Sequence, residues 1–248
     1  MHTAFDQVEH RPWPLPERRW TWRQSWRDLL FAHWPVPASE LQPLVHPALR
    51  VQEIEGTSWV GGVPFHMRGV MRRPLPDLPW ISAFPELNLR LYVEAEGKPG
   101  VWFLSLDAGN PLAVWAARRF FHLPYFHARM QISGLPERAA YHAFRLSAPR
   151  GVEFAAEYAP CSEPYRAAPG TLEHWLTERY CLYATGPRGR LVRAEVHHAP
   201  WPLQRAEARI ERNDLLAPHG LAVSGPPALL HFSRRLDVVV WPPAAVAA

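Results

Sequence analysis

The segment Phe84-Pro-Glu-Leu-Asn-Leu-Arg-Leu-Tyr-Val93 decides the fold, because apolar and polar side chains alternate along it. Such alternation predicts an extended strand with two different faces. One face carries Leu87, Leu89, Leu91 and Val93; the other carries Glu86, Asn88, Arg90 and Tyr92. The alternation leaves two arrangements open. The polar face meets solvent, or it lines the lumen of a closed barrel while the leucines pack outside under helices.

More strands follow on both sides of this segment, separated by turns that contain glycine or proline. The turn Glu96-Gly97-Lys98-Pro99 joins a strand at Leu87 to Glu94 to one at Gly100 to Leu106. Alternation also predicts strands at 49–55, 57–63, 125–133, 140–148, 151–158, 191–198 and 229–240, the first two as a hairpin about Gly56. Since 28 prolines and 14 glycines interrupt the chain, short strands are favoured over long helices.

Helices are expected at only a few places. Asn110 followed by Pro111 is typical of a helix start, and it predicts a helix from Leu112 to Phe121. Thr171 can cap a helix at 172–179, and Ser39 a short one at 40–45, whereas 204–209 could be helical or extended. Long-range antiparallel pairing with a few covering helices predicts an α+β, mostly antiparallel β fold.

The composition is that of one globular domain. The chain has 248 residues, of which 48% are hydrophobic and 20% charged, and its 12 tryptophans mostly suit a core. We expect a single domain at 20–241, an N-terminal extension at 1–19 and a C-terminal tail at 242–248. Oligomeric state is left open, and a homo-oligomer would be unsurprising.

The charge pattern argues against several classes of partner. The formal net charge is +4, but no Lys/Arg run forms the footprint of a nucleic-acid-binding protein. No stretch approaches the length of apolar residues that spans a membrane, and the N-terminus lacks the apolar region of a signal peptide, so a cytoplasmic location is expected. Cys161 and Cys181 fit no metal motif or disulfide framework, and we expect them reduced, with no metal or cofactor.

A second polar strand offers further candidates for chemistry. Alternation at 125–133 places Tyr125, His127 and Arg129 on one face. Together these side chains can donate to an anion, relay a proton or hold a carboxylate. Trp59 and Trp102 are candidate aromatic walls of the same pocket, as is Trp201. No nucleophile elbow, P-loop or dinucleotide fingerprint is present.

Several blocks of the chain resemble the YqjF-like family of uncharacterised bacterial proteins, domain-of-unknown-function family 2071. These blocks begin at Phe31, Phe84, Gly100, Leu176, Val196 and Leu229, and the resemblance covers roughly residues 20 to 241. It implies a fold more than a function, because the family has no defined activity.

That family is in turn distantly similar to acetoacetate decarboxylase. The resemblance implies an antiparallel β cone with outer helices and a buried polar cavity. It also implies that Glu86 stands where the decarboxylase has its catalytic-site glutamate. The reactive lysine of the decarboxylase follows a Tyr-Pro-type dipeptide, here Leu123-Pro124, so its position is occupied by Tyr125.

The tyrosine argues against imine chemistry, which needs a primary amine with a depressed pKa. The one lysine in the chain, Lys98, lies in a Gly-Lys-Pro-Gly turn. Three hypotheses remain: a lysine-independent enzyme acting on a small oxo-acid or related carboxylate, a non-catalytic small-molecule binder, and a structural or partner-binding role. In the first, Arg90 or Arg118 would hold the carboxylate, with Asn88 and Arg129 as further ligand-binding candidates. Glu86 would be the acid or base, and Tyr125 with His127 would polarise a carbonyl or move a proton.

Overall fold

The structure is a computed structural model that describes residues 2–75 and 82–246. Over these residues it contains a 13-stranded, mostly antiparallel sheet with a few short helices, as the sequence predicts. The strands are β1 (Trp22–Val36), β2 (Arg50–Val51), β3 (Ser58–Arg72), β4 (Phe84–Ala95), β5 (Lys98–Ala108), β6 (Tyr125–Ser133), β7 (Ala139–Arg145), β8 (Glu153–Pro160), β9 (Cys181–Thr185), β10 (Leu191–His198), β11 (Gln204–Asn213), β12 (Leu229–Val240) and β13 (Ala244–Ala245). The α-helices are α1 (Ala38–Leu41), α2 (Pro111–Phe121) and α3 (Leu172–Thr177), with short 3-10 turns at Thr3–Phe5, Gln42–Leu44, Pro187–Gly189 and Ala217–His219.

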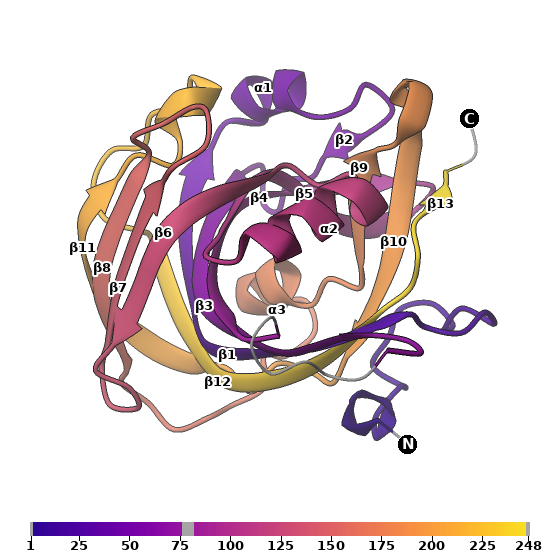
Figure 1. Cartoon of the computed structure of the whole chain (residues 1–248), viewed down its shortest axis with the longest axis horizontal. Helices are drawn as coiled ribbons and strands as arrows, with labels where there is room; N and C mark the ends of the chain where they lie inside the picture. The colour runs from indigo at the N-terminus through magenta and orange to yellow at the C-terminus, as the bar shows by residue number, and fades with distance from the viewer. Residues whose placement is uncertain (1, 76–81, 247–248) are drawn as a thin grey trace.

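The sheet curls until it nearly forms a ring (Figure 1). Strand pairing runs from β1 through β12, β10, β9, β5, β4 and β3 back to β1. The contact that completes this circuit is short, because β5 meets β9 only at Val101 and Trp102, in parallel. In Figure 1, α2 crosses the near side of the ring and α3 is seen beyond it.

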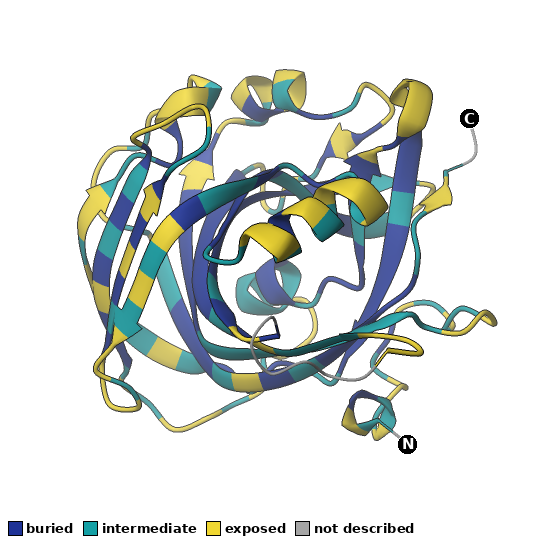
Figure 2. Ribbon diagram, viewed as in Figure 1, coloured by how far each residue is buried: buried dark blue, intermediate teal, exposed yellow. Residues whose placement is uncertain are grey.

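A second part of the sheet extends outward from the ring through β6, β7, β8 and β11, which returns to β12. Strand β4 therefore has the ring interior on one side and this outer part of the sheet on the other. Its leucines pack with Tyr141, Phe154 and Tyr158, from β7 and β8, in a hydrophobic core that lies outside the ring and is called the larger core below. Every residue from Glu86 to Val93 is buried, and Figure 2 shows that most of the strands around the ring are buried along much of their length.

Of the two arrangements left open for β4, the structure has the one in which the polar face is enclosed. The leucines pack, however, against strands and not under helices. The predicted hairpin about Gly56 is wrong, because β2 pairs with β4 and only an isolated bridge joins Ile54 to Thr57. The segment at 204–209 is extended, as part of β11.

The N-terminal segment is tethered to the sheet. Arg11 is buried, forms an ion pair with Glu195 of β10, and donates to the main-chain oxygens of Val196 and Tyr180. Ala4 packs with Val239 and Trp241 in a small core of its own. Within the described ranges, no helix combines the length and apolar character needed to cross a membrane.

Candidate functional site

The ring interior holds a cavity of about 160 Å³ between α2 and the residues that follow α3. Its walls are mainly apolar, and polar side chains project into it from two directions. The polar lining residues are Gln24, Glu86, Asn88, Arg90, Tyr125, Thr177, Arg179, Cys181 and His198. This is the composition typical of a small-molecule site, a largely apolar cavity with a few convergent polar groups.

Glu86 and Tyr125 form a hydrogen-bonded pair in the cavity wall. Tyr125 Oη donates to Glu86 Oε2 at 2.9 Å, and both side chains are buried. Burial raises the pKa of Glu86 to about 8; nearby Asp107 raises it further, while the Tyr125 hydrogen bond opposes the shift. Burial also raises the pKa of Tyr125 well above its ordinary value. At neutral pH Glu86 is therefore mostly a neutral carboxylic acid.

Two guanidinium groups face the same cavity near the end of α3. Arg90 donates to Tyr92 Oη at 3.2 Å and to the main-chain oxygen of Leu176 at 3.1 Å. Arg179 donates to the main-chain oxygen of Trp175 and to Gln52. Burial lowers the pKa of Arg179 to about 10, so this group still carries its charge at neutral pH.

The walls between these polar groups are aromatic and small aliphatic side chains. Trp26 stacks on Trp201 with ring centroids 5.6 Å apart, and both line the cavity. Helix α2 contributes Ala113, Ala116 and Ala117 to the lining. These alanines are spaced i, i+3 and i+4, so they share one helix face, and their small size leaves the space unfilled.

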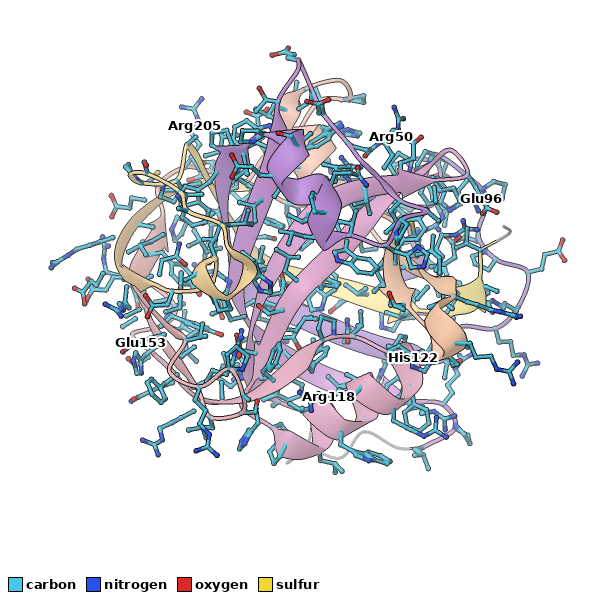
Figure 3. All side chains as sticks on the ribbon, turned by 90° about the horizontal axis from the view of Figure 1, so that it is seen from above. Arg50, Glu96, Arg118, His122, Glu153 and Arg205 are labelled. Carbon is cyan, nitrogen blue, oxygen red and sulfur yellow. The ribbon has the colours of Figure 1, made fainter. Side chains whose placement is uncertain are left out.

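The structure brings Glu86, Asn88, Arg90 and Tyr125 to one cavity, but not Arg118, His127 or Arg129. Arg118 is exposed on α2 and donates to the main-chain oxygen of Tyr125 at 2.6 Å; Figure 3 labels it on that helix. His127 is only half-buried and Arg129 is exposed. Strand β6 pairs with β5 only from Tyr125 to His127, so His127 lies at the end of this pairing and Arg129 lies beyond it. In this part of β6 the ring no longer encloses the strand.

Trp59 and Trp102, which the sequence also predicts to line the pocket, do not line the cavity. Trp59 packs with Tyr92, Val101 and Leu176 in a separate small core. Trp102 packs against the larger core, because its neighbours Val101 and Phe103 take the cavity face of β5. The expected third wall, Trp201, does line the cavity.

Sequence reasoning missed Arg179 and His198. The sequence predicts a helix through Arg179, whereas α3 ends at Thr177, and this earlier end turns the arginine into the ring. His198 and its neighbour His197 do face opposite sides of β10, as expected for a strand: His198 lines the cavity, and His197 stacks on Phe5 outside it. Burial lowers the pKa of His198, so its ring is neutral at pH 7.

The family model for DUF2071, uncharacterized conserved proteins, matches residues 23–237. This chain belongs to that family. It is also 44% identical over 228 residues to the uncharacterized protein YqjF of Bacillus subtilis (strain 168), covering 92% of this chain and 93% of YqjF. The resemblance of the sequence to the YqjF-like family is therefore confirmed.

Solved structures of acetoacetate decarboxylase-like proteins share the fold of this DUF2071 member. Acetoacetate decarboxylase from Legionella pneumophila superposes with a TM-score of 0.62 at 13% identity, covering 100% of this chain and 96% of that one. The enduracididine biosynthesis enzyme MppR complexed with pyruvate gives a TM-score of 0.62 at 13% identity, covering 96% and 93%. At this identity the likeness concerns the fold alone.

The single lysine of this DUF2071 chain does not reach the cavity. Lys98 lies at the start of β5, partly exposed, with its Nζ 3.4 Å from Glu195. Cys161 is exposed and Cys181 buried, and neither forms a disulfide. Burial raises the pKa of Cys181, which lines the cavity, to about 12, so its thiol is un-ionised at neutral pH. Across residues 2–75 and 82–246, no group of three or more His, Cys, Asp or Glu side chains could hold a metal ion.

Proposed function

We propose that this protein is a lysine-independent acid–base enzyme that acts on a small oxo-acid or related carboxylate inside the ring. The observation that supports it best is the buried Glu86, whose pKa is about 8. A catalytic acid or base works best when its pKa is near the working pH. Perturbed carboxyl groups in enclosed cavities are also concentrated at functional sites.

The chemistry follows from the Glu86–Tyr125 pair. The ionised fraction of Glu86 would remove a proton from the carbon next to the substrate carbonyl, and the electron pair of that C–H bond would form an enolate. Tyr125 keeps its proton because its pKa is raised. Once Glu86 has taken up the carbon-bound proton, the Tyr125 hydroxyl would turn its hydrogen from Glu86 to the enolate oxygen. Returning the proton from Glu86 to carbon regenerates the ketone, so the cycle needs no lysine.

Cavity volume limits the substrate. The volume of about 160 Å³ is close to that of an engineered cavity of roughly 150 Å³ that binds benzene in another protein. A substrate with a short chain or one small ring would fit. The buried guanidinium groups of Arg90 and Arg179 favour an anion over a neutral molecule.

Proton exchange tests this proposal without knowledge of the final product. Pyruvate, 2-oxopentanoate and 4-oxopentanoate would each be incubated with protein in D₂O, and loss of the proton signals next to the carbonyl followed by NMR. We expect accelerated exchange of at least one compound, with a rate that rises with pH and levels off above about pH 8. Glu86→Gln should lower this rate at least 100-fold, within the range expected for loss of a general base. Exchange at the wild-type rate by the Glu86→Gln variant would contradict the role of Glu86 as the base.

The absence of imine chemistry is tested separately with borohydride. Reduction in the presence of pyruvate traps an imine as a permanent mass increase on lysine. We expect no adduct on the wild-type protein, because Lys98 lies outside the cavity lining. Tyr125→Lys supplies a matched variant with an amine at the cavity wall, so an adduct on that variant alone would show that the method detects the reaction.

Binding without turnover is a second candidate, favoured by one observation. Glu86 and Tyr125 already satisfy each other in the largely apolar cavity, so no substrate is needed to complete their hydrogen bonding. A binder would be stabilised by its ligand in a thermal unfolding assay, yet no compound of the panel would exchange protons.

A further inference from the structure

The ring interior has two chemically different ends. Glu86 and Tyr125 form a neutral pair at one end, where β4 meets the start of β6. Arg90 and Arg179 lie at the other end, where consecutive main-chain oxygens of α3, those of Trp175 and Leu176, accept from them. Both ends line the same cavity.

The two guanidinium groups lie around the same tyrosine ring. Their central carbons lie 5.5 Å and 5.1 Å from the centroid of the Tyr92 ring, and the charge of Arg90 contributes to lowering the pKa of Arg179. The C-terminal end of α3 supplies the oxygens that hold them, and this end of a helix favours cations. Two like charges are thus fixed around Tyr92 and the end of α3, at one end of the cavity.

Neither guanidinium has a carboxylate partner among the residues that the structure describes. Arg90 contacts a hydroxyl and a main-chain oxygen, and Arg179 a main-chain oxygen and an amide. Nη2 of Arg179 is buried without a hydrogen-bond partner in the described chain. Glu94 is near enough to influence Arg179, but it bonds to Arg50 and Gln52 instead. Buried charges without a counter-ion are costly, so an anion should be drawn to this end.

The distance between the ends restricts which anion can fit. Glu86 and Arg90 are four residues apart on β4, so their Cα atoms are about 13 Å apart at the usual rise of a strand. The side chains point into one space but bind at opposite ends of it. No guanidinium is among the groups that shift the pKa of Glu86, which are burial, Tyr125 and Asp107. The carboxyl group and the two arginines are therefore well separated.

We propose that the ligand is a carboxylate whose reacting carbonyl is remote from its anionic group, with the carboxylate held between Arg90 and Arg179 and the carbonyl beside Glu86. This inference rests on the proposed function in placing the reacting group at Glu86. It adds that Arg179 is a binding residue, and that acids with the carbonyl next to the carboxylate are the poorer ligands. The apolar walls between the ends would cover the intervening carbon atoms.

Two isomers provide a matched test of the spacing. In 4-oxopentanoate the ketone is separated from the carboxylate by two methylene groups, whereas in 2-oxopentanoate the two groups are adjacent; 2-pentanone lacks the charge. We expect calorimetric titration to show at least tenfold tighter binding of 4-oxopentanoate than of either other compound. Equal affinity for the two isomers, or for 4-oxopentanoate and 2-pentanone, would overturn the inference without any variant.

Variants then locate the carboxylate. Arg179→Gln and Arg90→Gln should each weaken binding of 4-oxopentanoate at least tenfold, while leaving that of 2-pentanone unchanged. Arg138→Gln, in an exposed ion pair with Glu207, is the control and should bind like wild type. Unfolding curves would establish which variants are folded; if one arginine variant does not fold, the other and the comparison of ligands still decide.

The outcome also separates the two proposals. Binding of 4-oxopentanoate that depends on Arg179, without proton exchange, would support the location of the carboxylate and contradict the acid–base function. Exchange that depends on Glu86 but proceeds equally well with both isomers would support the acid–base function and contradict the proposed location of the carboxylate. Unchanged binding in a folded Arg179→Gln variant overturns the role of Arg179.

Discussion

Glu86 is a buried carboxyl group, and burial shifts its proton affinity far from that of an exposed glutamate. Its pKa rises from 4.5 to about 8. A proton held more tightly by the folded than by the unfolded chain stabilises the fold most at low pH. That contribution is complete below pH 4.5 and is lost progressively as the pH rises to 8.

This predicts a specific pH dependence of stability. Between about pH 5 and pH 8, the Glu86 contribution to the free energy of unfolding should fall by up to about 1.4 kcal/mol per pH unit. Glu86→Gln cannot ionise, so the stability difference between wild type and variant should shift in favour of the variant across this range. Urea unfolding at pH 5, 6, 7, 8 and 9 measures it. A constant difference over all five pH values would show that the pKa of Glu86 is not raised in the folded protein.

A buried ion pair joins β5 to β7 next to this site. Arg145 donates to both carboxylate oxygens of Asp107, at 2.6 and 2.7 Å, and the two side chains are 1% and 3% exposed. Removing one partner leaves a buried charge uncompensated, so Asp107→Asn should cost about 3–5 kcal/mol of unfolding free energy. The control, Glu207→Gln, breaks the exposed pair with Arg138 and should cost at most about 1 kcal/mol. Similar losses for both variants in urea unfolding would contradict the argument.

At the scale of single residues, the sequence predicts which face of a strand a side chain occupies, but not whether that side chain is buried. Alternation correctly groups Glu86, Asn88 and Arg90 on one face of β4, and all three line the cavity. The same rule groups His127 with Tyr125, yet only Tyr125 is enclosed. Where the ring stops covering a strand depends on long-range pairing, which no local pattern encodes.

Helix α2 covers one side of the cavity, and a single side chain holds its start. Asn110 Oδ1 accepts from the main-chain nitrogens of Leu112 and Ala113, at 2.9 and 3.2 Å. Asn110→Ala removes these bonds and should cost about 1 kcal/mol of stability. Ser39→Ala is the control: Ser39 was expected to cap α1, but Pro37 occupies the cap position and no side-chain cap bond forms there. Chemical unfolding of both variants tests this; an equal effect at the two sites would contradict it.

Elements with local signals are the ones that the sequence predicts well. The strands β6, β10 and β12 and the helix α2 start or end where alternation and capping place them. Strand β1 is missed, since Asp28 with a φ of 50° and Pro35 interrupt its pattern. Strand β9 is too short to show a clear alternation, and β2 pairs with β4, which is distant in the sequence. Neither feature can therefore be predicted from the local sequence.

The ring as a whole is completed at a tightly packed contact between β5 and β9. A Cβ atom on Gly100 would lie 2.6 Å from Cys181 Sγ and 2.8 Å from its main-chain oxygen. Since main-chain atoms cannot move aside cheaply, Gly100→Ala should cost about 1–3 kcal/mol or more. On Gly109 the nearest atom to such a Cβ is 3.6 Å away, so Gly109→Ala should be tolerated. Thermal unfolding compares them, and a stable Gly100→Ala variant would show that the β5–β9 contact is looser than described.

Strand β4 is buried on both faces from Glu86 to Val93, and this restricts how members of such a family can diverge. Glu86, Asn88 and Arg90 line the cavity, the leucines and Val93 pack in the larger core, and Tyr92 packs in the small core with Trp59, so any substitution from Glu86 to Val93 alters the cavity or a core. By contrast, α2 presents to the cavity one face, made by its three lining alanines and Phe121, and its opposite side is exposed (Figure 2). Changes of ligand size during evolution should therefore accumulate at Ala113, Ala116 and Ala117, where a larger side chain shortens the cavity without disturbing the larger core.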